Sequence, residues 1–221
     1  METSKKCKTI KITDDQQEYP LDLFCIPPHY NTALESVLIP NGMILDRVAR
    51  MAKDIINDLD DRSMHVLCML KGGFKFFGDL VECMAGNNRN TAKSVRIGVD
   101  FIRLKSYVDD KSTGQVQVIG IDDLSSLTGK NVLVVEDIVD TGRTMKKLLG
   151  LLSDVKPKSI KVASLLVKRR EGCLYVPDYA GFEVPDKFVV GYALDYNEYF
   201  RDLDHLCVMS ESGIKEYAVQ Q

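Results

Sequence analysis

The side chains best suited to chemistry follow a short apolar run in the middle of the chain. The mainly apolar run 131–135 (NVLVV) is followed, four residues later, by DTGRT at residues 140–144, where a helical pattern begins. A helix start directs free amides and the positive end of the helix dipole at an anion. Gly142 lets the backbone curl close to a phosphate, and Thr141 and Thr144 add hydroxyl donors. This spacing predicts a cradle for one phosphate group.

Two adjacent carboxylates, Glu136 and Asp137, lie between the apolar run and the cradle. Carboxylates repel a phosphate, so they favour a ligand that also offers hydroxyl groups or a magnesium ion. A sugar phosphate meets that requirement, because vicinal ribose hydroxyls donate hydrogen bonds to carboxylates. The alternative is a capped helix with surface acids, in which Asp140 or Thr141 serves as the N-cap.

Other nucleotide and hydrolase motifs are missing from the sequence. It contains no GxxxxGK[ST] and no GxGxxG, so neither a P-loop enzyme nor a Rossmann dinucleotide site is supported. It contains no GxSxG, which excludes the usual hydrolase elbow. The histidines His29, His65 and His205 are dispersed and form no HExxH, so a zinc site is not indicated.

The elements that must position the cradle alternate between short apolar runs and helical periodicity, which is typical of a parallel α/β sheet. Helices are predicted over residues 41–59, after Gly73 and after Thr144. Strands are predicted at residues 65–70, 95–101, 115–119, 131–135, 160–167 and 188–194. We expect an α/β fold with a doubly wound, mostly parallel sheet flanked by helices. Ligands of such sheets bind beyond the carboxyl ends of the strands.

We expect one domain over residues 1–221, with a core at about 38–190. A small hood lobe is expected from about 12–37 and 191–221. The polar stretches 109–112 and 120–128 flank the strand 115–119 and predict a long loop that could serve as an active-site lid.

Composition narrows the class of protein. The chain has 221 residues, 45% of them apolar, and a net charge of −3, which gives no reason to expect a nucleic-acid partner. No apolar run approaches the roughly 18–20 residues that span a bilayer, and the polar start lacks the apolar region of a secretory signal. Six cysteines without CxxC spacing fit a reducing cytoplasm better than a disulfide framework.

The run VLVVEDIVDTGRT resembles the motif with which type I phosphoribosyltransferases bind phosphoribosyl pyrophosphate (PRPP). LKGGFKFFGDL, VDFIRLKSY, VASLLVKR and PDKFVVGYALDYNEYFRDL resemble the hypoxanthine-guanine phosphoribosyltransferase family. The resemblance extends over residues 23–217. It implies a purine-salvage transferase that forms IMP or GMP and pyrophosphate from hypoxanthine or guanine and PRPP. It also implies magnesium as the cofactor, with two ions, and a homodimer or homotetramer.

The resemblance implies roles around the phosphate loop. Glu136 and Asp137 would hold the ribose hydroxyls. The 5′-phosphate would lie in the cradle of Asp140, Thr141, Gly142, Arg143 and Thr144. Asp140 would also accept a proton near purine N7, as the catalytic residue.

For the base, Lys168 would reach O6 and Phe188 would stack on the ring. The backbones of Val189 and Asp195 would contact the other edge of the purine. Lys168 has donors only, so it favours a 6-oxopurine over adenine. Considered alone, Lys168 could be a surface lysine at a strand end, and Phe188 and Val189 could be core residues.

For pyrophosphate, the resemblance implies Lys71, Gly72 and Arg201, with a cis peptide bond between Leu70 and Lys71. Asp195, together with Glu136 and Asp137, would hold metal. Ser106 and Tyr107 would belong to the lid.

Two features depart from the family pattern, and alternative functions stay open. Ile121 stands where a glycine is expected, and residues 169–175 are shorter than in close relatives. One alternative is a regulatory or catalytically weak nucleotide-binding paralogue with the same fold. Another is a transferase that also accepts xanthine. The balance between hypoxanthine and guanine is not determined.

Overall fold

The computed structural model of the chain describes residues 8–59, 63–89, 94–106, 116–121 and 123–219. Within them, a seven-stranded sheet has the order β1-β8-β7-β6-β3-β4-β5 and a three-stranded sheet has the order β2-β10-β9. Neighbouring strands of the larger sheet are parallel, except that β5 is antiparallel to β4. The expected α/β class with a mostly parallel sheet is confirmed.

The bounds of the elements are as follows. The larger sheet contains β1 (Ile10–Lys11), β3 (Ser63–Met69), β4 (Arg96–Ser106), β5 (Val116–Ile119), β6 (Asn131–Val139), β7 (Ser159–Lys168) and β8 (Tyr179–Val184). The smaller sheet contains β2 (Leu34–Ile39), β9 (Val189–Val190) and β10 (Leu206–Met209). The helices are α1 (Asn41–Asn57), α2 (Phe74–Arg89), α3 (Arg143–Asp154) and α4 (Glu211–Glu216), and the short 3-10 helices are η1 (Leu21–Leu23), η2 (Pro28–Tyr30) and η3 (Leu124–Leu127).

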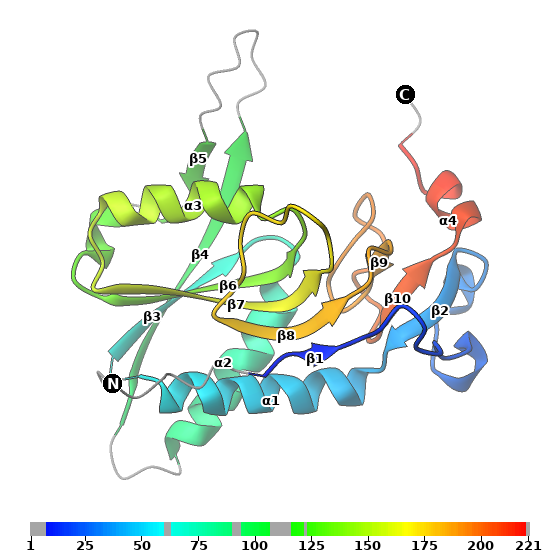
Figure 1. Cartoon of the computed structure of the whole chain (residues 1–221), viewed down its shortest axis with the longest axis horizontal. Helices are drawn as coiled ribbons and strands as arrows, with labels where there is room; N and C mark the ends of the chain where they lie inside the picture. The colour runs from blue at the N-terminus through cyan, green and yellow to red at the C-terminus, as the bar shows by residue number, and fades with distance from the viewer. Residues whose placement is uncertain (1–7, 60–62, 90–93, 107–115, 122, 220–221) are drawn as a thin grey trace, which may run out of the picture.

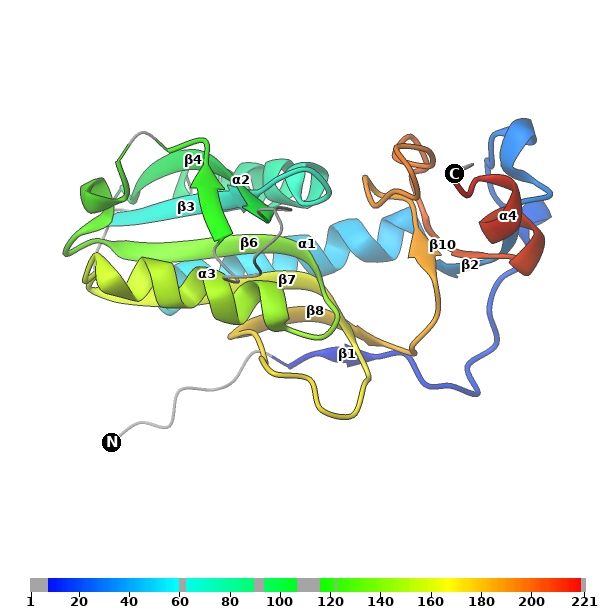
Figure 2. The same cartoon turned by 90° about the horizontal axis from the view of Figure 1, so that it is seen from above.

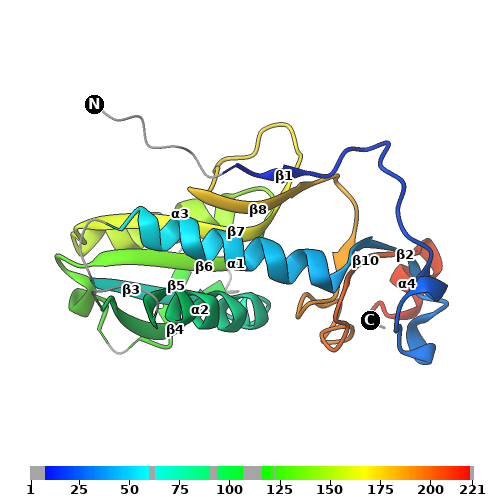
Figure 3. The ribbon, with the colours of Figure 1, turned by 90° about the horizontal axis from the view of Figure 1, so that it is seen from below.

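The larger sheet has helices on both faces (Figures 1 and 3). Helices α1 and α2 cover one face, and α3 covers the other. Two hydrophobic clusters fill these interfaces: the first joins α1 and α2 to the sheet, and the second joins α3 to it. Because both faces are covered, the central strand β6 is apolar at every position from Val132 to Val135 rather than alternating.

The amphipathic pattern of the helices explains their packing. In α1, Ile44, Val48, Met51 and Ile55 recur at helical spacing and are buried. In α3 the buried side chains are Met145, Leu148 and Leu152, which lie on one face in the same way.

A separate small lobe is formed by β2, β9, β10 and α4 with their connecting segments (Figure 2). It has its own hydrophobic cluster, in which Tyr30, Phe200 and Leu203 are buried. The parallel strands β6, β7 and β8 run toward this lobe, so their carboxyl ends face it (Figure 1). A site at those ends therefore lies between the larger sheet and the small lobe.

Three details differ from the expectations drawn from sequence. The last strand of the larger sheet is β8, whereas the predicted strand 188–194 is reduced to Val189–Val190 and pairs with β10 in the smaller sheet. The stretch 120–128 contains the helix η3 rather than only loop. Strand β6 continues to Val139, so Glu136 and Asp137 lie on a strand and not in a loop. Among the helices described, none is both long and apolar enough to cross a membrane.

Candidate active site

The phosphate loop connects β6 to α3. The last residue of β6 is Val139, and α3 begins at Arg143 with Gly142 as its N-cap. A hollow of about 120 Å³ at this connection is lined by Glu136, Ile138, Val139, Asp140, Thr141, Gly142, Thr144 and Met145. Four of the five predicted cradle residues thus line one hollow at the amino end of a helix, where an anion is favoured, whereas Arg143 does not line it.

Gly142 is required by the shape of this loop. Its φ is +73°, in the left-handed region that favours glycine. A Cβ at this position would also come within 2.7 Å of the backbone nitrogen of Tyr175. Next to Tyr175, the amide of Leu174 donates a hydrogen bond to the carbonyl of Thr141 at 3.0 Å. The turn at residues 172–175 therefore packs directly on the cradle, a contact that the sequence did not indicate.

The acids Glu136 and Asp137 share the end of β6 but differ in their surroundings. Burial raises the pKa of Glu136 well above its ordinary value, and the negative charge of Asp137 raises that pKa further. The carboxylate of Asp137 accepts a hydrogen bond from the amide of Ile138 at 2.7 Å. It also lies against Gly72, where any side chain would collide with it. Asp137 therefore joins the phosphate loop to the loop that follows β3.

Asp140 lies in a cluster of four charged side chains. Arg170 Nη1 is 2.7 Å from Asp140 Oδ1, and Arg170 Nε is 3.0 Å from Asp186 Oδ2. Lys168 Nζ is 3.8 Å from Asp140 Oδ2 and 3.4 Å from Asp186 Oδ1. The two cations thus bridge the same two carboxylates. Arg170 and Asp186 were missed from sequence; the basic run 168–170 is a signal for Arg170, but it does not tell which arginine turns inward.

A second hollow, of about 230 Å³, adjoins this cluster and reaches the small lobe. It is lined by Asp137, Ile138, Asp140, Lys168, Phe188, Val189, Leu194 and Asp195. The phosphate-loop strand, the end of β7 and the segment entering the small lobe therefore meet around one space. All four residues predicted to contact the base lie on its wall.

Phe188 lines this hollow and is partly exposed. Its side chain is 41% exposed and meets the ring of Tyr196 edge-on at 5.1 Å between centroids. Phe188 is therefore not a core residue, whereas Val189 is buried in β9. The side chain of Lys168 is only 14% exposed, which argues against an ordinary surface lysine.

The residues predicted to hold pyrophosphate come from both lobes. The Leu70–Lys71 peptide bond is cis, as expected. Lys71 Nζ is 2.8 Å from Glu198 Oε1. Arg201 Nη2 is 2.8 Å from Asp195 Oδ1 and 3.1 Å from Glu198 Oε2. Lys71 and Arg201 are thus brought together through Glu198, which the sequence did not single out.

The first part of the predicted lid, which includes residues 109–112, falls outside the described residues. Tyr107 lies there, and Ser106 is the last residue of β4. Ile121 packs against the hydrophobic cluster beneath α3 together with Leu124. The departure from glycine at this position therefore adds an apolar contact.

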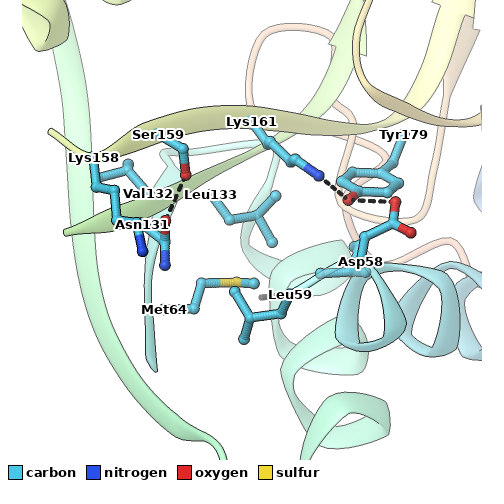
Figure 4. A pocket seen from close by; sticks show the side chains of 11 residues that line it. Asp58, Leu59, Met64, Asn131, Val132, Leu133, Lys158, Ser159, Lys161 and Tyr179 are labelled. Carbon is cyan, nitrogen blue, oxygen red and sulfur yellow. Dashed lines mark hydrogen bonds between the residues drawn. The ribbon is translucent and has the colours of Figure 1, made fainter. Parts of the chain in front are cut away.

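Another hollow lies at the opposite end of the larger sheet (Figure 4). Its polar side chains bond to one another: Lys161 donates to the hydroxyl of Tyr179 at 3.0 Å, and that hydroxyl donates to Asp58 at 3.0 Å. This hollow adjoins the amino ends of β6 and β7, away from the phosphate loop, and contains none of the predicted site residues.

Comparisons with known proteins show the family of the chain. Residues 39–197 match the phosphoribosyl transferase domain family. The hypoxanthine-guanine phosphoribosyltransferase of Mus musculus is 58% identical over 210 residues, which cover 95% of this chain and 96% of the relative. The Homo sapiens protein of the same name is 58% identical over 209 residues, with 94% and 96% covered.

A solved structure extends the similarity to three dimensions. The hypoxanthine-guanine phosphoribosyltransferase from Schistosoma mansoni, in complex with IMP, has a TM-score of 0.82 and 42% identity, with 96% of this chain and 100% of that chain covered. These similarities confirm the resemblance inferred from the motifs and do not favour a regulatory paralogue. The chain belongs to the phosphoribosyltransferase family and, within it, to the hypoxanthine-guanine phosphoribosyltransferases.

Proposed function

We propose that the protein forms IMP or GMP and pyrophosphate from hypoxanthine or guanine and PRPP, with the residue roles given below. The observation that carries these roles is the hollow shared by Asp137, Asp140, Lys168, Phe188 and Asp195. It offers carboxylates, a partly buried ammonium and an exposed aromatic ring around one space next to a phosphate cradle. The complex of the Schistosoma mansoni relative with IMP supports the same class of ligand.

The phosphate and sugar occupy the end of β6 in this proposal. The loop from Asp140 to Thr144 holds the 5′-phosphate through its amides and hydroxyls, because the start of α3 favours an anion. Arg143 adds a positive charge at the first position of α3. Glu136 and Asp137 accept hydrogen bonds from the ribose hydroxyls.

The purine is recognised in the second hollow, which Asp140 shares with the phosphate cradle. Lys168 donates to O6, and Phe188 stacks on the ring. Backbone groups of Val189 and Asp195 contact the other edge. Adenine places an amino group where the 6-oxopurine has a carbonyl, so two donors would face each other at Lys168.

Asp140 acts as the proton acceptor when purine N9 attacks the anomeric carbon and pyrophosphate leaves. Positive charge then grows on the ribose, and negative charge grows on the leaving group. Asp140 lines the base hollow and its carboxylate is 3.8 Å from the ammonium of Lys168, which supports this role. A positioned general base contributes about 10²–10⁴ in rate.

The leaving pyrophosphate is held by Lys71, Gly72 and Arg201. Gly72 has no side chain, so the backbone after β3 approaches Asp137 and the sugar site closely. Ser106 and Tyr107 form the lid that keeps water from the activated sugar. This lid assignment rests on the resemblance.

The carboxylates present fit magnesium. Asp137 and Asp195 line one hollow. Magnesium suits such a site because it binds through one or two carboxylates and takes its remaining ligands from substrate phosphates and water. We assign Asp195, Glu136 and Asp137 to two ions. When bound, the metal neutralises and orients the pyrophosphate.

The wider setting is also proposed. The small lobe acts as a hood over the site, and the boundaries between core and hood lie near residues 38 and 190.

A homodimer or homotetramer is supported by exposed apolar side chains on α2 and β4. A cytoplasmic location is supported by the five cysteines within the described residues, all of which are free.

An activity assay tests this proposal. Purified protein with hypoxanthine, PRPP and Mg²⁺ should produce IMP and pyrophosphate in a spectrophotometric assay. Asp140→Asn should lower kcat by about 10²–10⁴ and change PRPP binding much less, because the amide cannot accept the proton. No IMP from the wild-type protein would contradict the function. Normal turnover in the variant would remove only Asp140 from the mechanism.

A further inference from the structure

Glu198 bridges the two cations proposed to hold pyrophosphate. Its Oε1 is 2.8 Å from Lys71 Nζ, and its Oε2 is 3.1 Å from Arg201 Nη2. Lys71 follows β3 of the larger sheet, whereas Arg201 belongs to the small lobe. One carboxylate therefore uses both of its oxygens to pair with cations from both sides of the site.

The backbone at Glu198 is unusual for a glutamate. Tyr196 and Tyr199 form an antiparallel bridge, and the two residues between them have positive φ angles, 52° at Asn197 and 70° at Glu198. Two positive φ angles across a two-residue connection are typical of a type I′ turn, which favours asparagine or glycine. A glutamate at the second position is disfavoured by its backbone, so local turn formation does not account for it. Its distinguishing feature is the carboxylate that reaches Lys71 and Arg201.

The carboxylate of Glu198 is held by two cations, but another anion can replace it. Lys71 and Arg201 hold its carboxylate through ion pairs at 2.8 and 3.1 Å. Its side chain is 63% exposed, and water can replace the protein partners when it leaves. Exposed ion pairs of this kind contribute little net free energy, so another anion can displace the carboxylate at small cost.

We propose that Glu198 is a built-in competitor of pyrophosphate: its carboxylate pairs with Lys71 and, beside Asp195, with Arg201 in the ligand-free protein, and it gives up these contacts when the diphosphate binds. This inference rests on the proposed function of Lys71 and Arg201. Both anions need the same donors, so they exclude each other. The competition weakens binding of free pyrophosphate and of the diphosphate end of PRPP. It thereby favours release of the product, a step that limits turnover in many enzymes.

Calorimetric titration of the ligand-free full-length protein with inorganic pyrophosphate and Mg²⁺ tests the inference. Glu198→Gln should bind pyrophosphate about two- to fivefold more tightly than wild type, since it removes an exposed competing charge. Glu198→Asn should give the same gain, and asparagine is compatible with the turn, so a folding defect cannot explain that result. The gain should shrink as salt is raised, because screening weakens the ion pairs of Glu198.

Two further variants separate the possible outcomes. Glu216→Gln removes an exposed charge on α4 of the same lobe and should leave pyrophosphate affinity unchanged. Lys71→Met should weaken pyrophosphate binding, which tests the proposed role of Lys71 independently. If Lys71→Met weakens binding but neither Glu198 variant tightens it, the competitor role is overturned and the pyrophosphate site stands. The same gain in Glu216→Gln would also overturn it.

Discussion

The ammonium of Lys168 lies 3.4 Å from Asp186 and 3.8 Å from Asp140, and its side chain is only 14% exposed. Because it can only donate, a carbonyl is a suitable partner and an amino group is not. Lys168→Gln supplies an acceptor as well as a donor. It should lower the guanine-to-adenine ratio of kcat/KM by about tenfold or more, in steady-state assays with both bases.

Arg169 offers a matched control for that substitution. It neighbours Lys168 but pairs with Glu183 at 2.8 Å and with Asp14 at 2.8 Å, away from the hollow. Arg169→Gln should leave the ratio unchanged. An unaltered ratio in Lys168→Gln would count against its role in reading O6.

The raised pKa of Glu136 predicts a dependence of stability on pH. Burial and the charge of Asp137 keep this pKa above its ordinary value of 4.5 in the folded protein. Between the unfolded and folded pKa values, the folded protein therefore binds more protons than the unfolded chain, so stability falls as pH rises through that window. Glu136→Gln cannot titrate at this position, so it should not lose stability as the pH rises. Its melting temperature should exceed that of wild type at pH 8 and not at pH 4.

A surface glutamate provides the control for this measurement. Glu35 is exposed on β2, so Glu35→Gln should change the melting temperature little at either pH. In a chain of this size, about 1 kcal/mol of added stability raises the melting temperature by roughly 2–4 °C. Equal effects of Glu136→Gln at both pH values would contradict the raised pKa. The stabilised variant should also bind PRPP more weakly if Glu136 holds the ribose.

At the scale of elements, the connection between β6 and α3 depends on one backbone conformation. Gly142→Ala would place a Cβ in the left-handed region and within 2.7 Å of the Tyr175 nitrogen. We expect a loss of about 1–3 kcal/mol in the free energy of unfolding, measured by urea titration, and a raised KM for PRPP. The strain and the clash act on the loop that forms the cradle, so both quantities should change together.

Gly150, in the interior of α3, is the matched glycine for this comparison. A Cβ there would meet no atom within 4 Å. Gly150→Ala should therefore stabilise the helix by about 0.5–1 kcal/mol and leave the KM for PRPP unchanged. If Gly142→Ala behaved like Gly150→Ala, the loop would not need its left-handed residue.

At the scale of the whole molecule, apolar side chains remain uncovered at one edge. Leu70, Phe74, Val99 and Phe101 are 37%, 49%, 45% and 44% exposed, and Phe101 packs against Phe77 of the same helix as Phe74. Exposed apolar groups gathered on neighbouring elements often mark a contact between subunits. We expect a homodimer or homotetramer in solution, and Phe74→Glu should shift it toward smaller species in sedimentation velocity experiments.

A variant elsewhere on the surface checks that this shift is specific. Val176 is 70% exposed in the segment between β7 and β8. Val176→Glu should leave the sedimentation coefficient unchanged. A wild-type protein that sediments as a monomer at micromolar concentration would contradict the expected assembly.

The sequence by itself determined the parts whose physics is local. The strand β6, the glycine of the loop and the start of α3 follow one another in the chain, so their apolar run, backbone freedom and helix amides were recognised together. The long amphipathic helix α1 was predicted over residues 41–59 and is present from Asn41 to Asn57. The motifs that indicated the family are likewise contiguous runs of sequence, so they could be recognised without the structure.

Only the tertiary structure decided what depends on distant pairing. β8 lies between β7 and β1, and β9 pairs with β10; the positions of both strands are set by their partners rather than by their own patterns. Glu198 meets Lys71 across 127 positions of sequence, and Arg170 reaches Asp140 across 30. Charged side chains at such separations could each pair with many partners. Glu198 and Lys71 meet through the packing of the two lobes, whereas Arg170 and Asp140 meet because β6 and β7 lie side by side in the sheet. No local spacing encodes either pairing.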